Sequence, residues 1–120
     1  MARTNGKPYE ECLSGSWLAV RLGIEPVKID AMRRAGELIA VRRPDSTEWL
    51  YPAWQFSGTK PRPVVIRIVS AARESGLDES GLYEVLTAPR GIRGDSRLLD
   101  LVVEGRDEDV VEAVRREGRL

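Results

Sequence analysis

The sequence contains no histidine and only one cysteine, Cys12. A lone cysteine cannot form a disulfide within the chain, and a zinc site without histidine would need almost only carboxylate ligands, which zinc sites rarely have. The absence of histidine also removes the commonest general base and every nucleophile that a histidine activates. We therefore expect a protein that is not an enzyme and that holds no metal or cofactor.

Long hydrophobic runs are also absent. No segment approaches the roughly 20 consecutive apolar residues that a membrane helix requires. Residues 1–8 lack the apolar core of a secretory signal. These features predict a cytoplasmic protein with no membrane partner. A chain of 120 residues can hold one ordinary domain or two very small ones that pack together.

The formal net charge is zero, but the charges are unevenly divided along the chain. Residues 1–63 carry ten Lys and Arg against seven Asp and Glu, a balance of +3. Residues 64–120 carry nine against twelve, a balance of −3. The basic half is compatible with a polyanion, and the acidic half with a basic protein partner.

The first part of the chain predicts two short helices after a flexible arm over residues 1–13. Ser14 or Ser16 is placed to cap a helix that ends at Gly23, since a serine hydroxyl accepts hydrogen bonds from free N–H groups and glycine adopts a left-handed backbone readily. Pro26 begins the second helix, over 26–35, where its missing N–H costs nothing.

A β-hairpin is predicted next. The apolar period changes to two over residues 38–43 and 48–51, and the Pro-Asp-Ser sequence between them is typical of a turn. Pro52 ends the second strand because it has no N–H for the ladder. Residues 57–63 then read as a linker, and four helices follow, predicted over 64–76, from Asp78 onward, from Asp95 or Ser96 to Gly105, and from Asp107 to Arg116.

The segment from Leu22 to Leu38 resembles the MerR/excisionase type of winged helix-turn-helix. Its apolar and glycine positions match those that fill the core, the turn and the exit of that motif, namely Leu22, Gly23, Ile24, Ile29, Met32, Gly36 and Leu38. In that family the second helix enters the major groove, and the wing lies along the DNA backbone or the minor groove. The resemblance implies that the DNA-binding residues are Lys28, Arg33, Arg34, Arg42, Arg43 and Thr47.

Three residues of the second helix depart from the family pattern. Pro26 and Val27 stand where polar side chains usually read bases, and they can only touch a thymine methyl group. Asp30, next on the exposed face, would repel phosphates. Loss of DNA binding therefore remains an alternative.

A second resemblance covers residues 51–118. This part of the chain resembles antitoxins of the Xre/MbcA/ParS type in three segments: Tyr51-Pro52-Ala53-Trp54-Gln55-Phe56, the leucine-rich residues 98–106, and the acidic start of the last helix. It departs from the family at Ser96, where the family usually has proline. Such antitoxins bind a cognate toxin and repress their own operon. The resemblance implies a toxin-binding surface formed by Leu98, Leu99, Val102, Arg106, Val110, Val111 and Val114.

Together these observations predict a mostly α-helical fold with a small β-hairpin wing. A winged helix-turn-helix over 14–56 would bind double-stranded operator DNA, and a helical bundle over 62–120 would bind a toxin-like protein. Two alternatives stay open: a stand-alone DNA-binding homodimer without a toxin, and a pure protein-interaction module whose winged helix no longer binds DNA.

Overall fold

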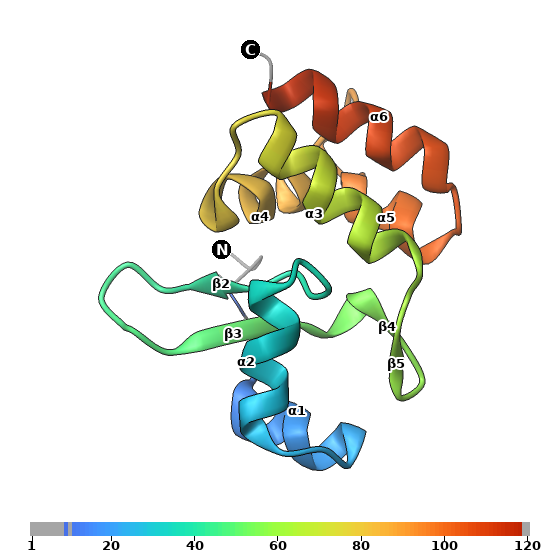
Figure 1. Cartoon of the computed structure of the whole chain (residues 1–120). Coiled ribbons are helices and arrows are strands. Elements are labelled where there is room, and N and C mark those ends of the chain that lie inside the picture. The colour runs from blue at the N-terminus through green and yellow to red at the C-terminus, as the bar shows by residue number, and fades with distance from the viewer. Residues whose placement is uncertain (1–8, 10, 119–120) are drawn as a thin grey trace.

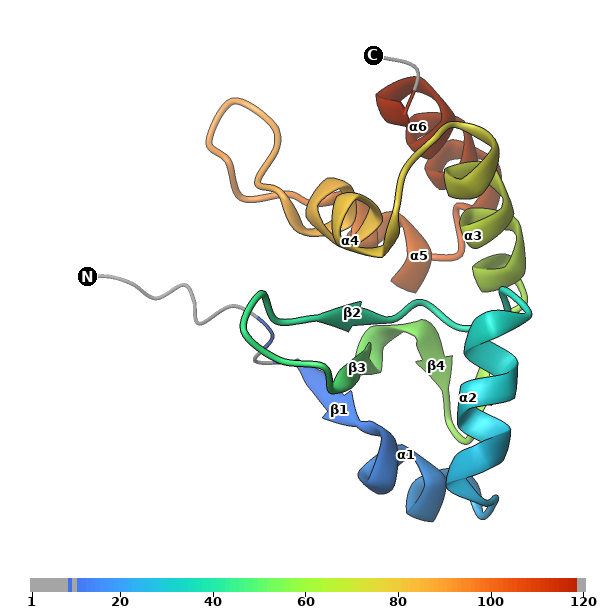
Figure 2. The ribbon, with the colours of Figure 1, turned by 60° about the vertical axis from the view of Figure 1, so that its left-hand side comes forward.

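The computed structural model describes Tyr9 and residues 11–118. Six α-helices, one short 3-10 helix and five short strands make up this part of the chain. The fold is mostly helical with a small antiparallel sheet. Figures 1 and 2 show two layers, in which α3, α4, α5 and α6 lie above a sheet-and-helix layer that contains α1 and α2.

The two N-terminal helices begin and end where the sequence predicts. Ser14 accepts a hydrogen bond from the Trp17 backbone N–H at 3.2 Å and caps α1 (Gly15–Leu22). Gly23 closes α1 with a left-handed φ of 71°. Pro26 opens α2 (Pro26–Arg34), and the chain leaves α2 through Gly36 at φ 81°.

The main sheet has three strands in the order β1-β3-β2, all antiparallel. Strands β2 (Val41–Arg42) and β3 (Trp49–Pro52) form the expected hairpin, although β2 is much shorter than the predicted 38–43. The third strand, β1 (Cys12–Ser14), corrects the prediction of a flexible arm over 1–13, because Cys12 and Leu13 pair with β3. Residues 1–8 and 10 of that arm lie outside the described residues.

A second correction concerns the predicted linker over 57–63. After the 3-10 helix η1 (Ala53–Gln55), the chain forms a small antiparallel hairpin of β4 (Phe56–Ser57) and β5 (Lys60–Pro61). Gly58 turns this hairpin with a φ of 66°. Arg62 follows this hairpin and holds it against η1, because its Nε donates to the Trp54 carbonyl at 3.1 Å.

The C-terminal layer contains α3 (Val64–Glu74), α4 (Glu79–Thr87), α5 (Leu98–Val103) and α6 (Asp107–Gly118). Asp78 caps α4 as predicted, since its carboxylate accepts from the Gly81 N–H at 2.8 Å. Helix α5 starts later than the predicted Asp95 or Ser96. Ser96 instead pairs with Arg90 across an intervening loop, and the Asp100 carboxylate accepts from the Arg97 N–H at 2.9 Å to start the helix.

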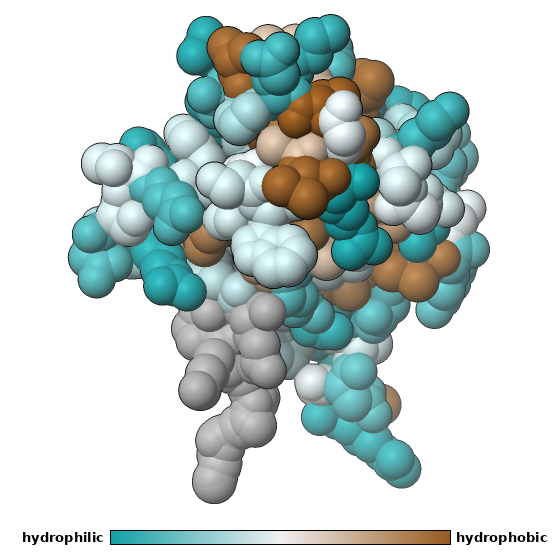
Figure 3. All heavy atoms as spheres, turned by 90° about the horizontal axis from the view of Figure 1, so that it is seen from below, coloured by the Kyte–Doolittle hydropathy of each residue, from teal (hydrophilic) through white to brown (hydrophobic). Residues whose placement is uncertain are grey.

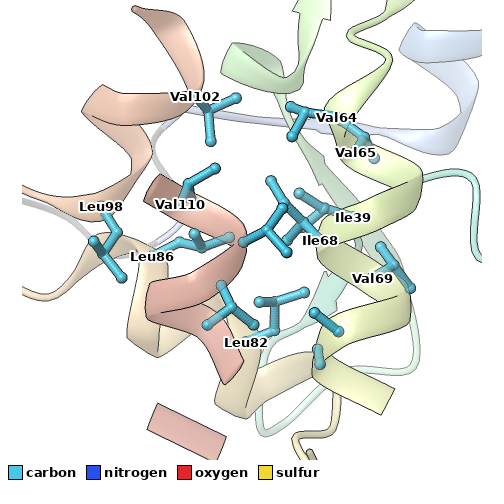
Figure 4. Packing of buried hydrophobic residues seen from close by; sticks show 14 of the residues in the cluster. Ile39, Val64, Val65, Ile68, Val69, Leu82, Leu86, Leu98, Val102 and Val110 are labelled. Carbon is cyan, nitrogen blue, oxygen red and sulfur yellow. The ribbon is translucent and has the colours of Figure 1, made fainter. Parts of the chain in front are cut away.

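Two clusters of buried side chains form the core. The smaller one lies between α1, α2 and the sheet, and the larger one fills the space between α3, α4, α5 and α6 (Figure 4). Residues 38–40 connect them, because Leu38 and Ala40 belong to the smaller cluster while Ile39 between them belongs to the larger. This alternation follows from the period-two geometry of extended chain. Within the described residues no helix is both long and apolar enough to cross a membrane.

Candidate nucleic-acid interface

Helix α2 presents one face to solvent and buries the opposite one. Ile29 is buried on the inner face, whereas Val27, Lys28, Ala31 and Arg34 are all exposed. These four positions recur at the spacing of three or four residues that places side chains on one side of a helix. The exposed face therefore combines two cations with two small apolar side chains.

Asp30 lies at the edge of that exposed face and is itself half-exposed. Its carboxylate lies 3.5 Å from the Arg33 guanidinium, and the exposed fractions of the two side chains are 48% for Asp30 and 16% for Arg33. The negative charge of Asp30 is therefore partly balanced by a cation of the same helix. The mostly buried position of Arg33 also corrects its expected role, because a side chain that is only 16% exposed offers little of its guanidinium to a phosphate.

Trp49 explains why Arg33 is held there. The Arg33 guanidinium lies 4.3 Å from the centre of the Trp49 ring, and the Arg42 guanidinium lies 4.5 Å from the same centre. Cations at this distance from an indole ring are attracted by its electron-rich face. Arg42 and Trp49 also stand directly opposite each other in the β2–β3 register. The stack links α2 to the hairpin and restricts the position of Arg42.

Burial has a further consequence beside this stack. It raises the pKa of the Tyr51 hydroxyl above its ordinary value, and the neighbouring Arg33 guanidinium opposes part of that rise. Tyr51 therefore stays neutral at physiological pH. Its buried ring packs in the smaller core cluster, which makes Arg33 part of the support of that core.

The tip of the β2–β3 hairpin is exposed and carries mixed charge. Arg43 and Thr47 are exposed, as are the carboxylates of Asp45 and Glu48. The turn is held by Ser46, whose N–H donates to the Arg43 carbonyl at 3.1 Å and whose hydroxyl accepts from the Glu48 N–H at 3.0 Å. Of the six predicted DNA contacts, Lys28, Arg34, Arg42, Arg43 and Thr47 are thus exposed on α2 or the hairpin, and Arg33 is not.

The supporting role of Arg33 makes a prediction for stability. Replacing Arg33 with alanine removes its stack on Trp49 and its ion pair, so we expect the free energy of unfolding to fall by about 1–2 kcal/mol. The neighbouring variant Arg34→Ala removes the same charge from an exposed position and should change it by about 0.5 kcal/mol or less. Urea denaturation of both variants measures the difference. Equal stabilities would show that Arg33 does not support the fold.

The predicted toxin-binding residues require a larger correction. Six of them are buried in the larger core cluster, with exposed fractions between 0% and 7%: Leu98, Leu99, Val102, Val110, Val111 and Val114. They hold α5 and α6 against α3 and α4 and offer no surface to a partner. Only Arg106 is exposed, and its guanidinium forms an ion pair with Asp109 at 2.6 Å. The apolar residues that these helices do expose are Ile66 and Val103.

Cys12 lies in a setting that suppresses thiol chemistry. Burial raises its pKa to about 11, and the thiol lies 3.8 Å from the Tyr83 hydroxyl of α4. Since the thiolate is the reactive form, Cys12 is a structural contact between β1 and α4. The described residues contain no group of three His, Cys, Asp or Glu side chains placed to hold a metal ion.

Gln55 is a buried polar residue that the sequence reasoning missed. It is fully buried, and its amide exchanges two hydrogen bonds with the backbone of Ile39: Oε1 accepts from the Ile39 N–H at 2.7 Å and Nε2 donates to the Ile39 carbonyl at 2.8 Å. Nε2 also donates to the Pro52 carbonyl at 3.0 Å. The only available sequence signal was its position inside an otherwise apolar segment, residues 51–56.

Comparison with known proteins identifies the fold alone. Neither a protein-family model nor a curated protein matches the chain. Among solved structures, the chain is similar to the NMR structure of Rv2175c, with a TM-score of 0.78 over 97% of this chain and 86% of that one. The two sequences are 19% identical, so the similarity establishes a shared arrangement of helices and strands.

Proposed function

We propose that this protein is a DNA-binding regulator whose α1, α2 and β2–β3 hairpin form a winged helix-turn-helix. The observation that carries the proposal is the exposed face of α2, where Lys28 and Arg34 flank Val27 and Ala31. Asp30, half-exposed at the edge of this face, is paired with Arg33. A helix with small residues at its exposed centre can approach the floor of the major groove closely. Its cations then reach base edges or phosphates.

The hairpin supplies the second part of the proposed interface. Arg42, restricted by Trp49, and Arg43 at the tip would contact the phosphate backbone beside the groove. Asp45 and Glu48 in the same hairpin limit how closely the rest of the tip can approach phosphates. Specificity would then come from α2, and the hairpin would add affinity that depends strongly on salt.

A salt-dependent titration tests this function. The purified protein is titrated against its own upstream DNA and against a scrambled duplex between about 50 and 200 mM salt, where phosphate contacts change affinity steeply. We expect tighter binding to the upstream DNA. The variant Arg42→Ala should make the salt slope shallower by about 0.9 if Arg42 neutralises one phosphate. Arg34→Ala should weaken binding by about 1–3 kcal/mol and reduce the preference between duplexes if Arg34 reads a base.

Arg116→Ala is the matched control. Arg116 is exposed near the end of α6, in the layer opposite α2 (Figure 1), so its loss removes one positive charge away from the proposed interface. Its titration should follow that of the unaltered protein. Absence of binding to either duplex at about 50 mM salt, where electrostatic attraction is strongest, would overturn the proposal.

We further propose, on the resemblance to Xre/MbcA/ParS-type antitoxins, that the α3–α6 layer binds a toxin-like protein. Because the six valine and leucine candidates are buried, contact would be made by Arg106 and by exposed residues such as Val103, which is 49% exposed. Co-purification with the product of an adjacent toxin-like reading frame, weakened by Val103→Asp, tests this half. A genome neighbourhood without such a reading frame would favour the stand-alone DNA-binding alternative.

A further inference from the structure

Helix α1 has an apolar face that nothing in the described chain covers. Trp17 and Val20, three residues apart on the same side of α1, have exposed fractions of 69% and 79%. The opposite side of the helix is buried through Leu18 and Ala19. Seen from below, where α1 faces the viewer, hydrophobic side chains extend from the upper part of the view through its centre to the right, among hydrophilic ones (Figure 3).

A depression of about 600 Å³ adjoins this face. Leu13 of β1 and Leu50 of β3 contribute apolar lining, and Trp17 and Val20 form its helical side. β1 is an edge of the three-stranded sheet, so the depression lies along a strand that has a paired neighbour on one side only. Open strand edges and exposed apolar patches are both surfaces at which proteins associate.

The charged side chains at the depression indicate what kind of partner fits it. Arg21 and Glu48 both line it, both are exposed, and neither side chain forms an ion pair within the described residues. One surface thus carries an apolar centre with one cation and one anion. In a two-fold symmetric contact, if residue i of one copy meets residue j of the other, then j of the first copy also meets i of the second. Arg21 of each copy can therefore face Glu48 of the other, which gives two ion pairs.

We infer that the face formed by α1 and β1 is a self-association surface, and that its partner is a second copy of this chain. Trp17 of each copy packs against the depression of the other, and two reciprocal Arg21–Glu48 ion pairs set the orientation. A tryptophan that becomes buried at the centre of an apolar contact when two proteins associate is the kind of residue that dominates the binding free energy of an interface. Balanced charges at the depression do not favour an anionic membrane surface, which selects basic faces.

The first test is the oligomeric state without DNA, so that a failure of the proposed DNA binding leaves its outcome unaffected. Sedimentation of the full chain should show a concentration-dependent dimer. Trp17→Ala should raise the dimer dissociation constant by about tenfold or more. Ile66→Ala is the control, because Ile66 is an exposed apolar residue of α3, away from this face. A strictly monomeric protein up to about 100 µM, well above micromolar affinities, overturns the inference, as do equal dissociation constants for the two variants.

The second test uses the two charges. In R21E every intermolecular pair would join two carboxylates, and in E48R every pair would join two guanidinium groups, so each variant alone should dissociate. An equimolar mixture should form a heterodimer, because both of its pairs then join opposite charges. Circular dichroism checks that both variants are folded. Recovery in the mixture supports the two-fold arrangement, whereas unchanged self-association of either variant overturns it.

Discussion

Replacing Gln55 with glutamate is expected to lower the free energy of unfolding by about 3–5 kcal/mol at neutral pH. The Gln55 amide donates from Nε2 to the carbonyls of Ile39 and Pro52 while Oε1 accepts from the Ile39 N–H, all in a fully buried site. A carboxylate keeps the accepting oxygen but turns both donated hydrogen bonds into contacts between oxygens. It also places an unpaired charge where no solvent reaches it.

The loss should depend on pH in a defined direction. Burial raises the pKa of a carboxyl group above its value in the unfolded chain, about 4.3 for glutamate. The charge penalty of Gln55→Glu is therefore fully present above the raised folded pKa, and it disappears as the pH falls below the unfolded one. Once protonated, the carboxyl group can again donate to one of the two carbonyls.

Gln55→Met is the matched control for this prediction. Methionine has a similar length and no charge, so it leaves the Ile39 backbone groups unpaired at every pH and should cost about 2–4 kcal/mol. Urea denaturation near pH 7 and near pH 4.5 compares both variants, each against the unaltered protein at the same pH. A Gln55→Glu variant that is as stable as the unaltered protein at pH 7, or whose deficit does not shrink in acid, would contradict the role assigned to Gln55.

The local signals in the sequence predicted the ends of α1 and the starts of α2 and α4 well, although not the start of α5. Ser14 and Asp78 cap α1 and α4, and Gly23 and Pro26 mark the turn between α1 and α2. Each of these features depends on backbone groups no more than about four residues away. Such signals are complete within a short window of sequence. They required no knowledge of what the helix packs against.

Contacts between distant segments were not accessible in the same way. The strand β1 needs β3 as its partner, 36 to 40 residues along the chain in the observed register, and its three residues carry no strand signal of their own. Residues 38–40 have the alternating pattern of a strand, but the backbone N–H and carbonyl of Ile39 form hydrogen bonds with the Gln55 side chain. A neighbouring strand does not supply these bonds. Arg33 appeared as one more surface cation, because only the fold brings Trp49 beside it.

The prediction of the partner-binding residues was wrong for a different physical reason. A face of leucines and valines at helical spacing is required both by an interface and by a core, and the sequence pattern is identical in the two cases. Val110 and Val114 are 0% exposed because α6 packs on α3, and that packing is a property of the whole bundle. Arg106, the one polar member of the predicted set, was the only one whose exposure the sequence could have indicated.

Ile68→Ala is expected to lower the free energy of unfolding by about 3–5 kcal/mol. Ile68 lies in α3, is 0% exposed and points into the larger core cluster among side chains from the neighbouring helices (Figure 4). Removing three carbon atoms there costs their transfer free energy and leaves a cavity that the packed helices fill only in part. Ile66 lies two residues away on the outer side of the same helix and is 55% exposed, so Ile66→Ala should cost about 1 kcal/mol or less.

The effect of Ile68→Ala should extend beyond the C-terminal layer. Ile39 joins the larger cluster from the N-terminal half, and the Arg73 guanidinium of α3 donates to the Arg34 carbonyl at the end of α2 at 3.4 Å. Because these contacts couple the layers, native-state hydrogen exchange should show reduced protection at Ile29 as well as at Val110. Ile29 amide protection that matches the unaltered protein, with protection lost only at Val110, would show that the two layers unfold independently. The layers would then be two domains, and the junction at Ile39 and Gln55 would be a contact between them.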